Sequence, residues 1–148
     1  MNTVETYLKS IEIDVKKVKP FIPEINYGKV VKVHDGDTIT IVTPLHNGDV
    51  APKVELYKFN VRVLGIDTPE LKTKIVKEKE LGIIARDALH ALLINKVVKL
   101  KNISYDKYGR ILSNVFLDDV NVSEWLVSNK YAVLYNGGKK TKKWAEDV

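Results

Sequence analysis

The residues best suited to chemistry in this sequence are acidic side chains placed where predicted strands begin or end. Asp37 begins the strand that leaves a tight turn, and Asp67 directly follows an apolar strand. Two carboxylates paired with neither histidine nor cysteine suit a hard cation with oxygen ligands, Ca²⁺ or Mg²⁺ rather than zinc. A backbone carbonyl near Thr68 and water would complete such a site. Either aspartate alone is better explained as a strand terminus, so this interpretation requires the two strands to be neighbours.

Two arginines and a glutamate extend this candidate set. Arg62 lies inside an apolar strand, where a cation is costly unless it is paired with an anion. Arg110 follows a Tyr-Gly turn and, taken alone, would be an ordinary surface arginine. A guanidinium presents a planar fork that matches phosphate oxygens, and phosphoryl transfer builds negative charge on those oxygens. Glu70 follows the stiff corner at Pro69, where it could take a proton from an attacking water.

The elements that must position these residues are short strands and one long helix. Helical spacing predicts an amphipathic helix from Leu81 to about Asn95, and Ser123 is a candidate cap for a short helix around Trp125. Gly65 permits a bulge or a bend near the end of its strand. This order of elements favours a small closed sheet with helices packed on it, as in an OB-type barrel. The predicted strands, in chain order, are Lys29–His34, Thr38–Val42, Val54–Ile66, Val97–Ser104 and Ile111–Leu117, and Tyr131–Tyr135 is a last strand or an extended segment.

We divide the chain into an N-terminal extension, residues 1–27, and a single globular domain, residues 28–148. In the extension, Val4, Leu8 and Ile11 have helical spacing behind a Thr3 cap, whereas residues 11–15 alternate like a strand. The two interpretations overlap, and the sequence does not separate them.

Composition limits the class of protein. A 148-residue chain with 45% hydrophobic residues can bury a real core, and the absence of cysteine excludes disulfides and thiolate metal sites. No apolar run reaches the roughly 18 residues of a membrane span, and residues 1–15 lack the apolar core of a signal peptide. We therefore expect an intracellular protein, unless a leader has been trimmed from it. The net charge of +5 is compatible with a polyanionic partner without requiring one.

Several short motifs, in this order, resemble the staphylococcal nuclease (thermonuclease-like) family, with similarity from about Lys29 to Tyr135. The resemblance implies an α+β, mainly β fold: a five-stranded OB-fold-type barrel with two or three packed helices. It also implies a Ca²⁺-dependent phosphodiesterase that hydrolyses DNA, RNA or both to products with a 3′-phosphate. The motifs are Asp35-Gly36-Asp37-Thr38, Val61-Arg62, Asp67-Thr68-Pro69-Glu70 and Asp106-Lys107-Tyr108-Gly109-Arg110.

The same resemblance assigns roles position by position. The metal ligands are Asp37, Asp67 and the backbone carbonyl of Thr68; the catalytic residues are Arg62, Glu70 and Arg110; the substrate-binding residues are Tyr108 and Tyr135.

Three functional hypotheses follow, of which a small structural or interaction domain is favoured only if Asp37 and Asp67 lie far apart. An active nuclease is favoured because each matched metal and catalytic position keeps the required residue type, whereas a binding module has no need of Glu70 or two site arginines. The alternative is a catalytically silent OB-type nucleic-acid-binding module that uses the basic tail and aromatic residues. We expect a monomer that acts on single-stranded or unstructured DNA or RNA, with no membrane partner.

Overall fold

The computed structural model describes residues 2–45, 54–136, 138 and 144 of the chain. None of its helices, within those residues, has the length and apolarity needed to cross a membrane. In chain order the elements are α1 (Thr3–Ser10), η1 (Val15–Lys17), β1 (Tyr27–Asp35), β2 (Thr38–Thr43), β3 (Tyr57–Val63), β4 (Ile66–Asp67), α2 (Val76–Leu93), β5 (Val97–Tyr105), β6 (Ile111–Leu117), β7 (Val120–Asn121), α3 (Val122–Ser128) and β8 (Val133–Leu134).

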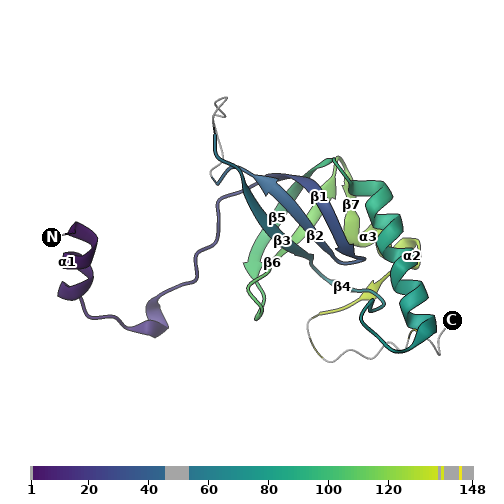
Figure 1. Cartoon of the computed structure of the whole chain (residues 1–148), viewed down its shortest axis with the longest axis horizontal. Helices are drawn as coiled ribbons and strands as arrows, with labels where there is room; N and C mark the ends of the chain where they lie inside the picture. Colours follow the sequence, from purple (N-terminus) through teal and green to yellow (C-terminus); the bar gives the residue numbers. More distant parts are fainter. Residues whose placement is uncertain (1, 46–53, 137, 139–143, 145–148) are drawn as a thin grey trace.

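Five strands form a closed barrel. The sheet runs in the order β3-β2-β1-β5-β6, with antiparallel neighbours, and parallel pairing of β3 with β6 closes it. The closure brings Val61 opposite Ile111 and Arg62 opposite Leu112. Figure 1 shows α2 and α3 packed at one end of this barrel. The predicted OB-type fold, mainly β with packed helices, is confirmed.

Buried and exposed side chains alternate along the strands, so the barrel has an apolar interior and an exposed outer face. On β5, Val98 and Leu100 point inward and are buried, whereas Lys99 lies on the exposed face. Helix α2 covers the interior with Leu89 and Leu93, both fully buried. Complete burial of one such side chain contributes about 1.5–3 kcal/mol. The barrel is therefore a rigid support for the loops at its ends.

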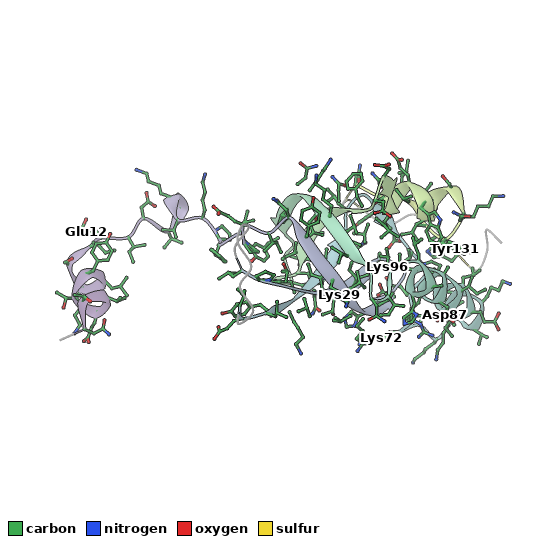
Figure 2. The ribbon with its side chains drawn as sticks, turned by 90° about the horizontal axis from the view of Figure 1, so that it is seen from above. Glu12, Lys29, Lys72, Asp87, Lys96 and Tyr131 are labelled. Carbon is green, nitrogen blue, oxygen red and sulfur yellow. The ribbon has the colours of Figure 1, made fainter. Side chains whose placement is uncertain are left out.

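The N-terminal arm, residues 2–22, extends away from the barrel (Figures 1 and 2). Figure 2 places Glu12 far along the arm from Lys29 on β1. The helical interpretation is confirmed for Thr3–Ser10, but the side chain that caps the helix belongs to Asn2, which accepts from the N–H groups of residues 4 and 5. Residues 11–14 form neither helix nor strand.

Three predicted boundaries were wrong. The long strand predicted over Val54–Ile66 is β3 followed by a turn at residues 64–65 and then β4, because Gly65 adopts a left-handed conformation with φ of 86°. Helix α2 begins at Val76, earlier than predicted. Ser123 lies inside α3, which Asn121 caps. The lysines of the basic tail, residues 139–143, fall outside the described residues.

Candidate active site

The turn between β1 and β2 fixes Asp37 through its backbone as well as its side chain. The Asp37 N–H donates to the Asp35 carboxylate over 3.1 Å, and its carbonyl accepts from the Val63 N–H over 2.8 Å. Its two carboxylate oxygens accept from the hydroxyls of Thr38, at 3.0 Å, and Thr68, at 3.1 Å. These bonds orient the carboxylate of Asp37, a residue that is only 7% exposed.

Gly36 allows this turn to pack against the segment that carries Thr68. A Cβ at Gly36 would lie 2.9 Å from Cγ2 of Thr68 and 3.0 Å from Cβ of Ala85 on α2. Any larger residue would push these neighbours apart. The Asp-Gly dipeptide thus provides a tight hairpin turn and also lets α2 hold Thr68 beside Asp37.

Arg62 lies between the two predicted metal carboxylates. Its Nη1 is 3.3 Å from Oδ2 of Asp37, and its Nη2 is 3.9 Å from Oδ1 of Asp67. The same nitrogens donate to the carbonyls of Val63, at 3.1 Å, and Ile66, at 3.0 Å. All three charged side chains are 10% exposed or less. Because buried charges are tolerated only with good pairing, this arrangement explains how two carboxylates are buried together.

Asp35 is a site residue that the sequence reasoning treated only as part of a turn. Burial, a hydrogen bond with the Asp37 carboxyl and the charge of Asp37 together raise the pKa of Asp35 to about 7, although the hydrogen bond from the Asp37 N–H and the charge of Arg62 oppose the shift. The Asp-Gly-Asp spacing was the signal available, since a tight turn brings its two flanking carboxylates close. A neighbouring cation would relieve this crowding of negative charge.

The residues present fit a hard cation. The donors that converge are carboxylate oxygens of Asp37 and Asp67, with Thr68 hydrogen-bonded to Asp37, and oxygen ligands are what Ca²⁺ takes. Among the described residues, no three His, Cys, Asp or Glu side chains are grouped so that they could hold a metal ion by themselves. A cation here would therefore need backbone carbonyl and water ligands in addition.

Arg110 is held by the turn between β5 and β6. Asp106 accepts from the N–H groups of Tyr108 and Arg110, each over 2.9 Å, and from Nε of Arg110 over 2.6 Å. Burial opposes ionisation of Asp106, but the hydrogen bonds from Arg110 and Tyr108 outweigh it and lower the pKa of Asp106. The guanidinium carbon of Arg110 lies 5.5 Å from the centre of the Tyr108 ring, in the range of a cation–π contact.

Arg62 and Arg110 both line a cavity of about 870 Å³. The Tyr135 N–H donates to the Gly65 carbonyl over 2.9 Å, which brings the end of β8 to this cavity. Both predicted substrate-binding tyrosines therefore line the same cavity as both predicted arginines. The lining includes Arg62, Gly65, Tyr108, Arg110, Leu112 and Tyr135.

Glu70 lies two residues beyond Thr68 and is exposed. Its backbone N–H is 3.4 Å from one carboxylate oxygen of Glu78 in the first turn of α2, and the other oxygen of Glu78 accepts from the Thr73 hydroxyl. Among the described contacts, the structure brings Asp37, Arg62, Asp67 and Thr68 into one cluster, and Glu70 is exposed.

Comparison with known proteins identifies a family. The model of the staphylococcal nuclease homologue family matches residues 60–147. An "uncharacterized endonuclease" of Escherichia coli is 32% identical over 110 residues, which cover 74% of this chain and 61% of the relative. "Endonuclease Htp3" of Saprolegnia parasitica is 36% identical over 116 residues, 73% of this chain and 55% of that protein. "Probable endonuclease LCL3" of Komagataella phaffii is 29% identical over 144 residues, 85% and 62% respectively. The chain thus spans about three fifths of the length of these relatives.

Proposed function

The chain belongs to the staphylococcal nuclease homologue family, and from that premise we propose that it is a Ca²⁺-dependent nuclease acting on DNA, RNA or both. The endonuclease names of its relatives support this activity. One structural observation supports the proposal most directly: Arg62 and Arg110 line the same cavity, and Arg62 also contacts two buried carboxylates. A domain that only bound nucleic acid would gain little from so costly a buried arrangement.

The two arginines are the groups that would bind the phosphate undergoing cleavage. Asp106 accepts a hydrogen bond from Nε of Arg110, so the two terminal nitrogens of Arg110 are the groups that would donate to phosphate oxygens. Arg62 is fixed by two carbonyls, so it needs little reorganisation when negative charge develops on the phosphate.

Asp37, Asp67 and the backbone carbonyl of Thr68 are the groups that would hold Ca²⁺. When bound, the cation supplies positive charge beside the phosphate and acts as a Lewis acid. Hydroxyl donors from Thr38 and Thr68 keep the Asp37 carboxylate oriented for this task.

Glu70 is the proposed general base. It takes a proton from water as the water oxygen attacks phosphorus, and the bond from phosphorus to the 5′ oxygen breaks on the opposite side. The departing 5′ oxygen takes a proton from solvent. The products are therefore a 3′-phosphate and a 5′-hydroxyl. Tyr108 and Tyr135 offer rings beside the cavity on which an unpaired base can stack, which supports a preference for single strands.

Cleavage of single-stranded DNA by purified protein tests the proposal. We expect cutting with Ca²⁺, none with excess chelator, and products that a polymerase extends only after phosphatase removes the 3′-phosphate. Glu70→Gln should slow cutting by about 10²- to 10⁴-fold, the usual contribution of a general base. Glu80→Gln, an exposed glutamate on α2, is the matched control and should cut like the parent.

Three results would contradict parts of this proposal. Cutting that persists in chelator would remove the requirement for a divalent cation. Equal cutting by the Glu70 and Glu80 variants would exclude Glu70 as the base. Binding without cutting in any divalent metal would favour the silent OB-type binding module instead.

A further inference from the structure

The outer faces of β1, β5 and β6 carry lysine and aromatic side chains in register. Tyr27 pairs with Lys99, and Lys99 pairs in turn with Phe116, so the three residues form one row across three strands. In the next row along β5, Lys101 pairs with Asn114. Directly opposed residues on one sheet face lie about 4.5–5.5 Å apart. We call the surface formed by these five residues the outer track.

The lysines of the outer track lie against its rings. Nζ of Lys101 is 4.8 Å from the centre of the Phe116 ring, and Nζ of Lys99 is 5.9 Å from the centre of the Tyr27 ring. Both lysines are exposed, and Tyr27 is 55% exposed. Tyr27 is thus exposed and Phe116 half-buried, and each ring lies beside a cation, which pairs a stacking surface with a phosphate-binding group.

The outer track is continuous with the cavity that holds the arginines. Leu112 lines that cavity, and Asn114 and Phe116 follow it at two-residue intervals on the same face of β6. Two residues along a strand span about 7 Å, so the track extends roughly 14 Å beyond Leu112. At its far end lie the acidic residues Asp118 and Asp119, in the turn before β7. A polyanion following the track from the cavity would therefore meet lysines first and carboxylates last.

Single-stranded nucleic acid is the partner that this surface fits. Proteins that bind single strands combine lysines that follow the backbone with aromatic rings on which successive bases stack, and a sheet face can provide both. A duplex offers no unstacked bases to these rings. An acidic peptide would use the lysines but would not require Tyr27 and Phe116 beside them.

We propose that the outer track binds the part of a single-stranded substrate that extends beyond the catalytic cavity. This inference rests on the proposed nuclease function, because it assigns the track to the same substrate. Its consequence is selection by length: a strand long enough to reach from the cavity to Phe116 binds more tightly than one that fills the cavity alone.

The test is equilibrium binding by fluorescence anisotropy in chelator, where cutting does not interfere. The probes are a labelled single strand of about 16 nucleotides, at the upper end of OB-fold sites, and a labelled dinucleotide. Lys99→Ala/Lys101→Ala removes two exposed charges from the track. Lys16→Ala/Lys17→Ala removes two exposed charges from the N-terminal arm and is the matched control.

We expect the Lys99/Lys101 variant to bind the long strand at least tenfold more weakly at about 0.1 M salt. The slope of the logarithm of its binding constant against the logarithm of the salt concentration should become shallower by about 1.4, because each lysine that no longer neutralises a phosphate removes about 0.7. Its affinity for the dinucleotide should change by less than about twofold. Phe116→Leu keeps the charge and the apolar bulk, so it should weaken long-strand binding without altering the salt slope.

The proposal is overturned if the arm variant loses as much affinity as the track variant, because the effect would then be one of net charge alone. It is also overturned if the dinucleotide and the long strand are weakened equally. Since these measurements need no cutting, they test the track even where the parent protein proves inactive. Conversely, the parent protein could cut while the track variant binds the long strand as tightly as the parent. That result supports the proposed nuclease function and overturns only the proposal about the track.

Discussion

Replacing Arg62 with methionine tests whether the guanidinium is what allows Asp37 and Asp67 to be buried together. The substitution keeps an apolar stem of similar length but removes both ion contacts, at 3.3 and 3.9 Å, and both hydrogen bonds to backbone carbonyls. Removing one partner from a buried ion pair costs about 3–5 kcal/mol, because the remaining charges are left uncompensated. The free energy of unfolding should fall by at least that amount.

Urea denaturation in excess chelator measures this loss. With an m-value of about 2 kcal/mol/M, the midpoint should fall by about 1.5–2.5 M at unchanged m. Arg86→Met is the matched control, because Arg86 pairs with Asp87 at an exposed site and should change stability by less than about 0.5 kcal/mol. Added Ca²⁺ should restore part of the lost stability. Equal midpoints for the two variants would refute the argument that Arg62 neutralises the buried carboxylates.

Two further predictions concern the supports of the site and of the barrel. Asp106→Asn removes the carboxylate that holds Nε of Arg110 and should slow cutting by about 10²-fold, because a misplaced catalytic group costs about that much. Asp119→Asn, in the exposed turn before β7, is the control and should cut at the parent rate. Similar cutting rates for the two variants would show that Arg110 does not need Asp106. Burial, and then the charge of Lys32, lower the pKa of His34 below 6.5 although Asn60 opposes the shift. At His34 the unfolded chain therefore binds more protons than the folded one, so the contribution of His34 to stability should fall as pH drops through and below 6.5. Asp35, whose pKa is raised, contributes with the opposite sign over the same range. The urea midpoint of His34→Gln should therefore rise relative to that of the parent as pH drops from about 7 to about 5, and a constant difference between the two proteins would exclude the His34 contribution.

The pairing that brings the carboxylates together could be predicted because it depends on local signals. Asp35-Gly36 specifies a tight turn, and β2 and β3 are consecutive strands that pair directly, with Thr38 opposite Arg62. Once those two strands are neighbours, Asp37 and Arg62 lie close to each other, because Asp37 directly precedes the partner of Arg62. The residues of the buried cluster could accordingly be named from the sequence.

The break after β3 could not be predicted, because contacts with distant segments fix it. The Leu64 N–H donates to the Ser113 carbonyl over 2.9 Å, and the Leu64 carbonyl accepts from the Ser123 hydroxyl over 2.8 Å. A glycine inside a strand pattern is equally compatible with a bulge, a bend or a turn. The second of these contacts also explains why Ser123 does not cap α3, since its hydroxyl is already used.

The partial burial of Asp35 beside Asp37 also could not be predicted from the sequence. An Asp-Gly turn is normally solvated, whereas here Ala85 and Thr68 pack closely against Gly36. That packing depends on where α2 lies, which neither the turn nor the helix pattern specifies by itself.

The parallel closure of β3 on β6 has a consequence for how the protein folds. Val61 and Ile111 are partners fifty residues apart in the chain, with all of α2 and β5 between them. Bringing such distant segments together must overcome loop-closure entropy before their contacts form, which makes it a slow event in folding. Arg62 lies on β3 and Arg110 directly precedes β6, so the same event joins the two sides of the cavity. A nascent chain would therefore have to emerge through β6 before it could close this cavity, and a folding intermediate with an open barrel would lack it.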